Sequence, residues 1–543
     1  MKWSFVLALA AALLTRTGLA AGQDLPAGAG EPRLSLVGGP QRAFGETAVK
    51  RTFKVEGAGQ YDLVWESRIF RGIVDRGSRT VDAPANVTIE MALPEVRARV
   101  DMIQHVQLKR DDKVLAEDDF VLGIFSKDAL PELGRTTADL PPIGLCDPEM
   151  LIAPVLEKAG VKYTPLRTDL QARTLESKLV LVGPDQPETF SEPMVGIREL
   201  LDRGGTVIFL EQNSPKKGLF GADKPVEVAK RPVLSARKLV GEKHILLRDL
   251  REGDLAGWAG SGEVASNVLG WPEYANYQAW LAGGQGKDRA PLVAQYWGEN
   301  GRVILCQLEV GRRLAQEPVA QLVLRNLLSY AREVPLPAPR KAVRFAVPPE
   351  ALEGGKFNTA RFVLEPKKED LKGAAAVLIL LVHKGDESAM TPGFDLGQYL
   401  SDGGKLLVQS RFGPELMEAL NQLTRSTWQD KPYLPLPRFV AASVEDIGAV
   451  RMRYEKPLAW GILAEDFQQG LQGVEDPRCL KAEPAVPEFL ALTEPSYLTQ
   501  FRRGKSRLVL CALPVEGPEN ESQARLVRQI LANMMLEEDK DAQ

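Results

Sequence analysis

The chain has 543 residues, of which 44% are hydrophobic and 26% are charged, and its formal net charge at pH 7 is −4. A chain of this length is too long for a single hydrophobic core and predicts about three or four domains. Acidic and basic residues are interspersed along the sequence, so the composition argues against binding to nucleic acid or to an anionic membrane surface.

Residues 1–21 have the pattern of a secretory signal peptide. Lys2 supplies a short positive region, Phe5–Leu14 is apolar, and small residues follow at Gly18 and Ala20. A retained membrane anchor is the alternative, but the apolar run is too short to cross a bilayer. No later stretch reaches about 18 consecutive apolar residues. The sequence therefore predicts an exported protein, periplasmic or extracellular, with no integral membrane segment in the mature chain.

Residues 31–128 predict a β-sandwich. The stretch YDLVWES places Tyr61, Leu63 and Trp65 on one face of a strand. The apolar-polar runs NVTIEMALP, VDMIQHVQLKR and DFVLGIF follow, separated by turn residues. Short alternating strands at regular spacing, without a helical period, are typical of a sandwich.

Residues 141–332 predict an α/β domain. In order, the sequence predicts a strand in PIGLCD, a helix in PEMLIAPVLEKAG, strands in VKYTPL and KLVLVGP, a helix in SEPMVGIRELLDRGG and a strand in TVIFLEQ. Strands that are apolar on both faces and alternate with helices form a parallel sheet with helices on both sides. A proline-rich linker over residues 333–355 follows this domain.

The α/β pattern recurs over residues 356–537. Four pairs of segments match in order, which predicts two copies of one unit. They are LLDRGGTVIFLEQ (200–212) with YLSDGGKLLVQS (399–410), HILLRDLREGDLAGW (244–258) with KPLAWGILAEDF (456–467), RVILCQL (302–308) with RLVLCAL (507–513), and the helices that carry Ala-x-Leu-Val at Ala320 and Ala524. We expect Cys306 and Cys511 to lie on equivalent strands.

These segments resemble class I glutamine amidotransferase-like domains, which have a flavodoxin-like sheet. They are most similar to the degenerate versions found beside secreted glycosidases, including the trimerisation domain of some β-galactosidases. The preceding sandwich, with its Trp65 and the run VLAEDDFVLGIF, resembles the immunoglobulin-like domains of family 2 glycoside hydrolases. The resemblance implies a multidomain β plus α/β chain: an N-terminal β-sandwich followed by two flavodoxin-like doubly wound α/β domains.

The two α/β copies lack the catalytic residues of that family. An active member needs a cysteine on the sharp turn of a Gly-x-Cys-x-Gly motif, and a histidine after the strand that here reads RVILCQLEV. At the first position this chain has TVIFLEQN and KLLVQSRFG, where Ser410 is the only hydroxyl near the turn. At the second position Glu309 is present, but no histidine. We therefore expect no glutaminase chemistry and name no catalytic residue.

The four cysteines are Cys146, Cys306, Cys479 and Cys511, without C-x-x-C spacing. We interpret them as mostly free and buried, because a large exported protein with its own cores does not need disulfides. Cys306 and Cys511 lie in runs that are apolar on both sides, which favours core packing over catalysis. No metal-ligand spacing occurs among the cysteines and the three histidines, so we expect neither a metal site nor a cofactor.

A group of aromatic residues supplies the one candidate ligand site. It consists of Trp258, Trp271, Tyr274, Tyr277 and Trp280, mostly within GWPEYANYQAW. Flat aromatic faces bordered by polar groups suit the binding of sugar rings. The alternative is that the rings pack an insertion against the sheet of the first copy.

The expected function is that of an exported, non-catalytic, glycan-associated protein that serves in binding or assembly. Its expected partner is a glycan or a glycan-processing enzyme, and association into a homo-oligomer stays open. One alternative is a carbohydrate-active hydrolase with carboxylates that the sequence does not identify. Another is a structural protein of the envelope that uses the paired domains for protein contacts.

Overall fold

The computed structural model describes most of the chain between residues 31 and 534. Outside the described residues within this span lie 128–129, 137, 186–193, 215–225, 252, 272–276, 286–287, 298–299, 335–340, 346–361, 364–375, 382–395, 411, 429–436, 445–449, 472–473, 475–476, 505, 514–525, 527–528 and 531–532. The described chain divides into two compact units. The smaller contains residues 31–40, 46–95 and 99–124, and the larger contains residues 41–45, 96–98 and 125 onward.

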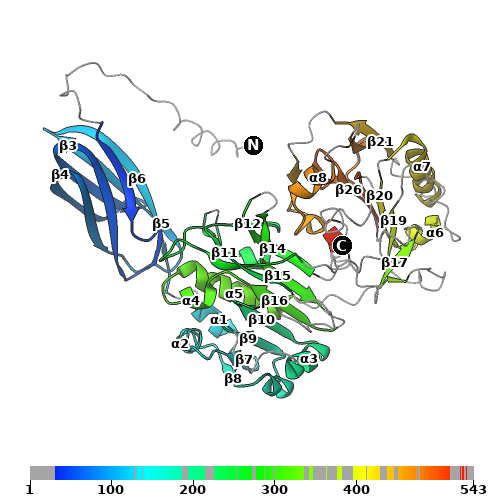
Figure 1. Cartoon of the computed structure of the whole chain (residues 1–543), viewed down its shortest axis with the longest axis horizontal. Coiled ribbons are helices and arrows are strands. Elements are labelled where there is room, and N and C mark those ends of the chain that lie inside the picture. Colours follow the sequence, from blue (N-terminus) through cyan, green and yellow to red (C-terminus); the bar gives the residue numbers. More distant parts are fainter. Residues whose placement is uncertain are drawn as a thin grey trace. The chain divides into compact units, whose positions relative to one another are not determined.

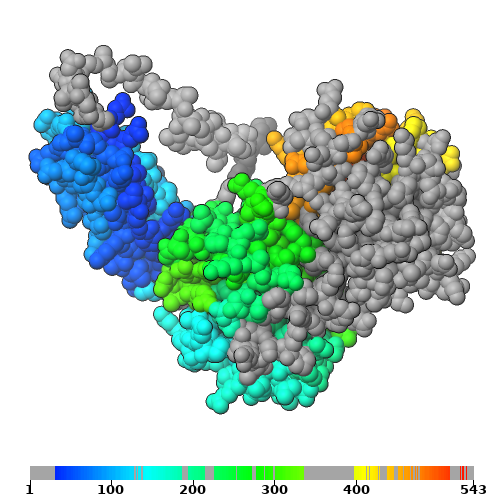
Figure 2. All heavy atoms as spheres, in the orientation of Figure 1, coloured from blue at the N-terminus to red at the C-terminus, as the bar shows by residue number. Residues whose placement is uncertain are grey.

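The smaller unit is built from long antiparallel strands (Figure 1). These are β1 (Arg33–Gly38), β3 (Ala48–Ile69), β4 (Gly72–Ala92), β5 (Val100–Arg110) and β6 (Lys113–Phe125), in the order β1-β3-β5-β6 with β4 beside β3. Figure 2 shows the same residues as a continuous blue surface.

The sheet of the smaller unit closes over an apolar interior. In β3, Leu63 is fully buried while the neighbouring Asp62 is exposed, as strand alternation requires. The ring of Phe53, near the start of the same strand, lies 5.1 Å from that of Phe120 on β6. Arg51 donates to Gln104 of β5 at 3.0 Å. Because β3 pairs with β5 only from Asp62 onward, these contacts reach across the interior.

The first half of the larger unit, residues 125–334, contains an eight-stranded sheet. Its order is β12 (Ala236–Lys238), β14 (Tyr277–Gly283), β15 (Ala290–Trp297), β16 (Arg302–Cys306), β10 (Thr206–Leu210), β9 (Leu179–Val182), β7 (Ile143–Cys146) and β8 (Tyr163–Pro165). The strands from β16 to β8 are parallel, and β12, β14 and β15 are antiparallel to their neighbours. A separate pair, β11 (Val228–Val233) and β13 (Ala265–Leu269), lies outside this sheet.

Helices cover both faces of this sheet. On β10, Ile208 and Leu210 join a core that also contains side chains of α2 (Ala153–Lys158) and α5 (Pro318–Glu333). The intervening residues of β10 point the other way, into a core that contains α3 (Val195–Asp202). The predicted strands that are apolar on both faces are therefore buried on both faces. The other helical elements of this half are α1 (Pro131–Thr136), α4 (Val310–Arg313), η1 (Asp169–Thr174) and η4 (Ile245–Leu247).

Helix α2 is shorter than the sequence predicted. It begins at Ala153 rather than at Pro148, because the carboxylate of Asp147 accepts the backbone N–H groups of Leu151, Ile152 and Ala153 at 2.7–3.1 Å. Met150, with φ of 54°, holds the preceding turn in a left-handed conformation. Side-chain capping of this kind fixes where a helix can start.

The second half of the larger unit, residues 341–534, repeats the strand order of the first. Its sheet runs β24 (Phe489–Ala491), β26 (Leu498–Arg503), β27 (Ser506–Cys511), β20 (Lys405–Gln409), β19 (Ala376–Leu381), β17 (Lys341–Phe345) and β18 (Phe362–Val363). The other described elements are α6 (Leu396–Ser401), α7 (Pro414–Trp428), α8 (Ala464–Gly470), η10 (Pro457–Ala459), and the pairs β21 (Arg438–Ser443) with β23 (Arg478–Glu483) and β22 (Arg451–Met452) with β25 (Thr493–Glu494).

The two sheets also agree residue by residue at their centres. Leu210 pairs with Cys306 across parallel strands, and Gln409 pairs with Cys511 in the same way. The next backbone N–H after each first strand donates to the cysteine carbonyl in both halves, from Glu211 and from Ser410. The expectation that Cys306 and Cys511 occupy equivalent strands is confirmed.

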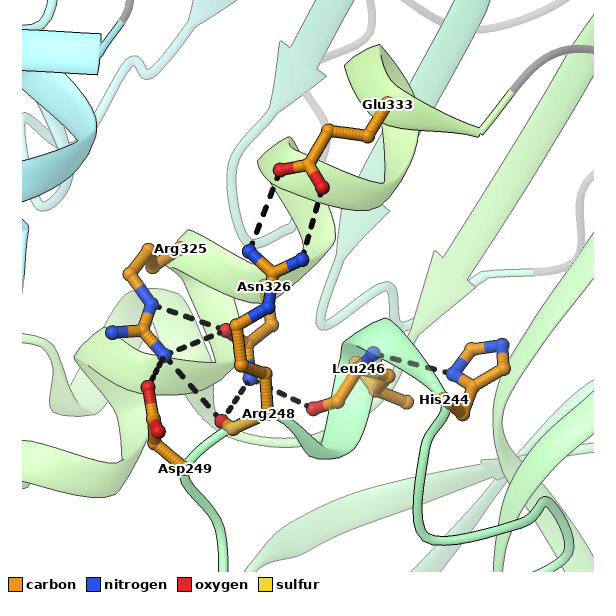
Figure 3. Close-up of polar contacts among 7 residues, drawn as sticks. All are labelled: His244, Leu246, Arg248, Asp249, Arg325, Asn326 and Glu333. Atoms are coloured by element: carbon orange, nitrogen blue, oxygen red, sulfur yellow. Dashed lines mark hydrogen bonds and ion pairs between the residues drawn. The ribbon is translucent and has the colours of Figure 1, made fainter. Parts of the chain in front are cut away.

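In each half, an asparagine near the C-terminal end of the half is hydrogen-bonded to the backbone of a 3-10 turn, η4 or η10. Asn326 donates its two Nδ2 protons to backbone carbonyls of η4 and the residue after it (Figure 3), and Asn533 does the same for η10, at 2.6–2.9 Å. The two turns are therefore equivalent, as the matching of residues 244–258 with 456–467 predicted.

The predicted match of Ala320 with Ala524 falls partly outside the described residues, because Ala524 is not among them. Asn326 and Asn533 are equivalent by their contacts and are 207 positions apart by subtraction of their numbers, whereas Ala320 and Ala524 are 204 apart.

Candidate functional site

The candidate site lies where the parallel strands β10 and β16 of the first sheet end, the usual place for ligands in open α/β sheets. Glu211 follows β10 directly, at the turn where the resemblance to amidotransferase-like domains led us to look for a cysteine. Its φ of 36° is a left-handed conformation, which is uncommon for a residue other than glycine. The sharp turn is therefore present, but it carries a carboxyl group instead of a thiol.

The carboxylate of Glu211 is fully engaged by the backbone. It accepts the N–H of Gly311 at 3.1 Å and the N–H of Arg312 at 2.9 Å, and the residue is only 5% exposed. Burial raises the pKa of Glu211 to about 8, against the lowering effect of both backbone donors and of the Arg312 charge. The sequence analysis did not single out Glu211, although a charged residue directly after a fully apolar strand was a usable signal.

Glu309 follows β16, at the position where the sequence resemblance led us to look for a histidine. One carboxylate oxygen accepts the hydroxyl of Ser266, and the other forms an ion pair with Arg313 at 2.8 Å. Glu309 is 5% exposed. Arg313 also reaches Ser261 at 3.3 Å. Both carboxylates at the strand ends are thus held by protein partners, and neither is presented to solvent.

The two central cysteines are core residues. Cys306 and Cys511 are at most 1% exposed, and all four cysteines are free and buried. Burial raises the pKa of the Cys306 thiol far above its ordinary value, with a further contribution from the nearby charge of Glu211. Burial likewise raises the pKa of Cys511 to about 12. Since the thiolate is the nucleophilic form, neither thiol is reactive near neutral pH, and the predicted core role is confirmed.

The second half has a different residue at the equivalent turn. Ser410 follows β20 and is 5% exposed. Its backbone N–H donates to Cys511 at 3.1 Å, as that of Glu211 does to Cys306 at 2.8 Å. The two turns therefore share a backbone position and differ in their side chains.

The predicted aromatic site is not one surface. Trp258 and Trp280 belong to the core on one face of the first sheet, whereas Tyr277 and Trp271 belong to the core on the other. Trp258, Tyr277 and Trp280 are at most 1% exposed. Trp271 is half-buried, its ring centroid lies 6.4 Å from that of Tyr277, and its indole N–H donates to the carbonyl of Arg289. Tyr274 lies outside the described residues.

This arrangement favours packing over ligand contact for the three buried rings, because no face of them is accessible. The indole N–H groups are also bonded internally, from Trp258 to the carbonyl of Asp254 at 2.9 Å and from Trp280 to Gln278 at 3.0 Å. Buried tryptophans usually find such a partner within the protein.

The described residues form neither a metal-binding cluster nor a membrane-spanning helix. Within them, His, Cys, Asp and Glu side chains nowhere gather in threes as a metal ion would need. Within the same residues, every helix is too short or too polar to span a membrane.

Comparisons with known proteins are weak. No protein family and no curated protein matches the chain. A β-glucosidase from Listeria innocua in complex with gluconolactone is 13% identical over 18% of this chain and 16% of its own length, with a TM-score of 0.14. Spo0M, the sporulation control protein of Bacillus subtilis, is 12% identical over 21% of this chain and 56% of its own, with a TM-score of 0.15. A glycosyl hydrolase family 2 member from Bacteroides cellulosilyticus DSM 14838 is 10% identical over 33% and 36%, with a TM-score of 0.13.

Weak structural neighbours of the chain thus include glycosidases, and the chain covers about a sixth of the β-glucosidase. Similarity at this level carries no argument about activity.

Proposed function

We propose that this chain is an exported, non-catalytic binding or assembly protein, in which an immunoglobulin-like sandwich precedes two degenerate amidotransferase-like domains. The shared strand order of the two sheets supports the pairing of the domains. The proposal of export rests on residues 1–21, and that of a glycan or a glycan-processing enzyme as partner rests on the family resemblance.

The proposal that the protein is non-catalytic rests on the hydrogen bonds that the side chain of Glu211 accepts. Acyl transfer at this turn needs an exposed nucleophile and a base within hydrogen-bond reach. Here the turn holds a carboxylate that accepts two backbone N–H groups, and Glu309 is bound to Ser266 and Arg313. The same contacts argue against the hydrolase alternative, because a glycosidase must present two carboxyl groups to its substrate.

One feature keeps the hydrolase as the second candidate. A buried carboxyl whose pKa is raised to about 8, beside a second carboxylate, is the kind of pair that divides acid and base roles in glycosidases.

A turnover assay with matched variants separates the two candidates. Purified chain, Glu211→Gln and Glu309→Gln would be assayed with glutamine and with a panel of aryl glycosides. We expect no turnover by any of the three proteins, together with binding of the wild-type chain to oligosaccharides on a glycan array. Turnover by the wild type that both variants lose would refute the proposal in favour of the hydrolase. If no oligosaccharide on the array binds the protein, the proposal that its partner is a glycan is wrong.

A further inference from the structure

The interior of the smaller unit contains a positively charged side chain that has only uncharged hydrogen-bond partners. Arg51, near the start of β3, is 1% exposed. Its Nη1 atom donates to Oε1 of Gln104 at 3.0 Å and to the carbonyl of Phe120 at 3.3 Å, and its Nη2 atom donates to the carbonyl of Val121 at 3.4 Å. Residues 31–125 are all described, so this set of partners is complete for the smaller unit.

The guanidinium of Arg51 keeps its charge although it is buried. Burial lowers the pKa of Arg51 from 12.5 to about 10, which leaves the group protonated at pH 7. A charge inside a protein is costly unless an opposite charge or a full set of hydrogen bonds compensates it. The three oxygen atoms that Arg51 reaches carry only partial charges, so its positive charge is not balanced by them.

The other buried polar residues of this unit lie beside Arg51. Within the fully described smaller unit, the buried polar residues are Arg51, Ser67 and Gln104. Ser67 and Gln104 are directly opposite each other on the paired strands β3 and β5, and both are fully buried. Their side chains are therefore neighbours on the inner face of the sheet. Since Gln104 also accepts from Arg51, the three residues form one polar cluster in an otherwise apolar interior.

Each side chain of this cluster has a polar atom that lacks a hydrogen-bond partner. These atoms are Nε of Arg51, Oγ of Ser67 and Nε2 of Gln104. The amide of Gln104 has one possible orientation, because arginine only donates and so requires Oε1 on its side. The two nitrogen atoms are donors only, and the hydroxyl of Ser67 can also donate. Three donors and one positive charge therefore meet in the same part of the interior.

An anion matches this set of donors better than a water molecule does. A water that accepted these hydrogen bonds would still have its own two protons to donate, and each atom of the cluster without a partner is itself able to donate. An anion accepts all three hydrogen bonds and balances the charge of the guanidinium. A divalent oxyanion would bring more charge and more acceptor oxygens than this cluster can satisfy. The donors therefore suit a monovalent, monatomic anion.

We propose that the smaller unit binds a halide ion, chloride in ordinary buffers, between Arg51, Ser67 and Gln104. The ion accepts from Nε of Arg51, from Nε2 of Gln104 and from the hydroxyl of Ser67. It links the first part of β3, which carries Arg51, to the last part of the same strand and to β5 (Figure 1). This site is separate from the two α/β domains, and it does not depend on the proposed binding of glycans.

The test compares the full chain in sodium chloride and in sodium gluconate at the same ionic strength, so that the screening of charges is equal. A ligand that binds only the folded state stabilises it by mass action. At a chloride concentration ten times the dissociation constant, we expect calorimetry to show a melting temperature higher by at least about 4 °C. In Arg51→Met the two salts should give the same melting temperature. Arg68→Met, the matched control, removes an exposed arginine from the same strand and should keep the difference.

Two further measurements locate the ion. Ser67→Ala should need about tenfold more chloride for the same rise in melting temperature, because it loses one hydrogen bond to a charged group. Wild-type crystals grown in sodium bromide should show an anomalous peak between the three donor atoms, whether or not Arg51→Met folds. Equal melting temperatures of the wild type in the two salts would overturn the proposal. So would a chloride effect that Arg51→Met retains, or a water molecule at the place expected for bromide.

Discussion

His244 offers the sharpest test of how the two halves of the larger unit are held together. It is 5% exposed, and its ring centroid lies 4.9–5.3 Å from those of Trp280, Tyr330 and Trp460. Trp460 belongs to the second half and the other two rings to the first. The Nδ1 atom accepts the N–H of Leu246, so the ring is neutral and carries its proton on Nε2.

Burial lowers the pKa of His244 from 6.5 to about 3. A group whose pKa is lowered by folding stabilises the fold fully above its unfolded pKa, and this contribution is lost as the pH falls toward the folded pKa. Between pH 7 and pH 5 the imidazole becomes protonated in the unfolded chain only. At about 1.4 kcal/mol per pKa unit, this proton uptake should lower the free energy of unfolding by about 2 kcal/mol.

The measurement is urea unfolding of wild type and His244→Asn at pH 7 and pH 5. Asparagine keeps a side-chain oxygen that can accept the Leu246 N–H at the helical turn but cannot take up a proton in this range. We expect the free energy of unfolding of the wild type to fall by about 2 kcal/mol more than that of the variant. Equal losses in the two proteins would show that His244 is accessible to protons in the folded state and would refute the reasoning.

Four other changes have definite expected outcomes. Burial raises the pKa of Glu211 to about 8, so its contribution to stability is present below about pH 4.5 and is lost as the pH rises to about 8. In urea unfolding, wild type should therefore lose about 2 kcal/mol or more relative to Glu211→Gln between pH 5 and pH 8, whatever the difference between the two proteins at pH 5. Cys306→Ala should cost about 1–2 kcal/mol and leave any ligand binding unchanged, and loss of binding by a folded variant would contradict its core role. Trp280→Ala should cost about 3–5 kcal/mol in a thermal melt, whereas a negligible effect would mean that the indole is not packed. Glu317→Ala removes the buried partner of Arg42, at 3.1 Å, and should cost about 3–5 kcal/mol, and an unchanged melting temperature would exclude an energetic role for this pair.

The central strands could be predicted from the sequence because their composition suits only a strand that is buried on both faces. TVIFL (206–210) and RVILC (302–306) are apolar on both faces, and such strands are stable only when both faces are covered. The matching cysteines then fixed the equivalence of the two sheets. The sequence shows that Glu211 directly follows an apolar strand, but not that its carboxylate binds the backbone N–H groups of Gly311 and Arg312.

Only the tertiary structure shows on which face of the sheet each aromatic residue is buried. Tyr277 and Trp280 are three positions apart on β14, so the alternation of side chains along a strand places them on opposite faces of the sheet. That YQAWLAG forms an internal strand buried on both faces depends on its pairing with β12 and β15, which the local sequence does not specify. The predicted single surface was divided for this reason.

The contact between the two halves shows the same division between sequence and tertiary structure. The sequence by itself determined that two related turns exist, with Arg248-Asp249 in one and Trp460-Gly461 in the other. Only the tertiary structure decided that the second turn is buried against β14 and that the first carries exposed ion pairs. Burial of a turn depends on surfaces that come from residues far away in the chain, and the local pattern of a turn holds no information about them.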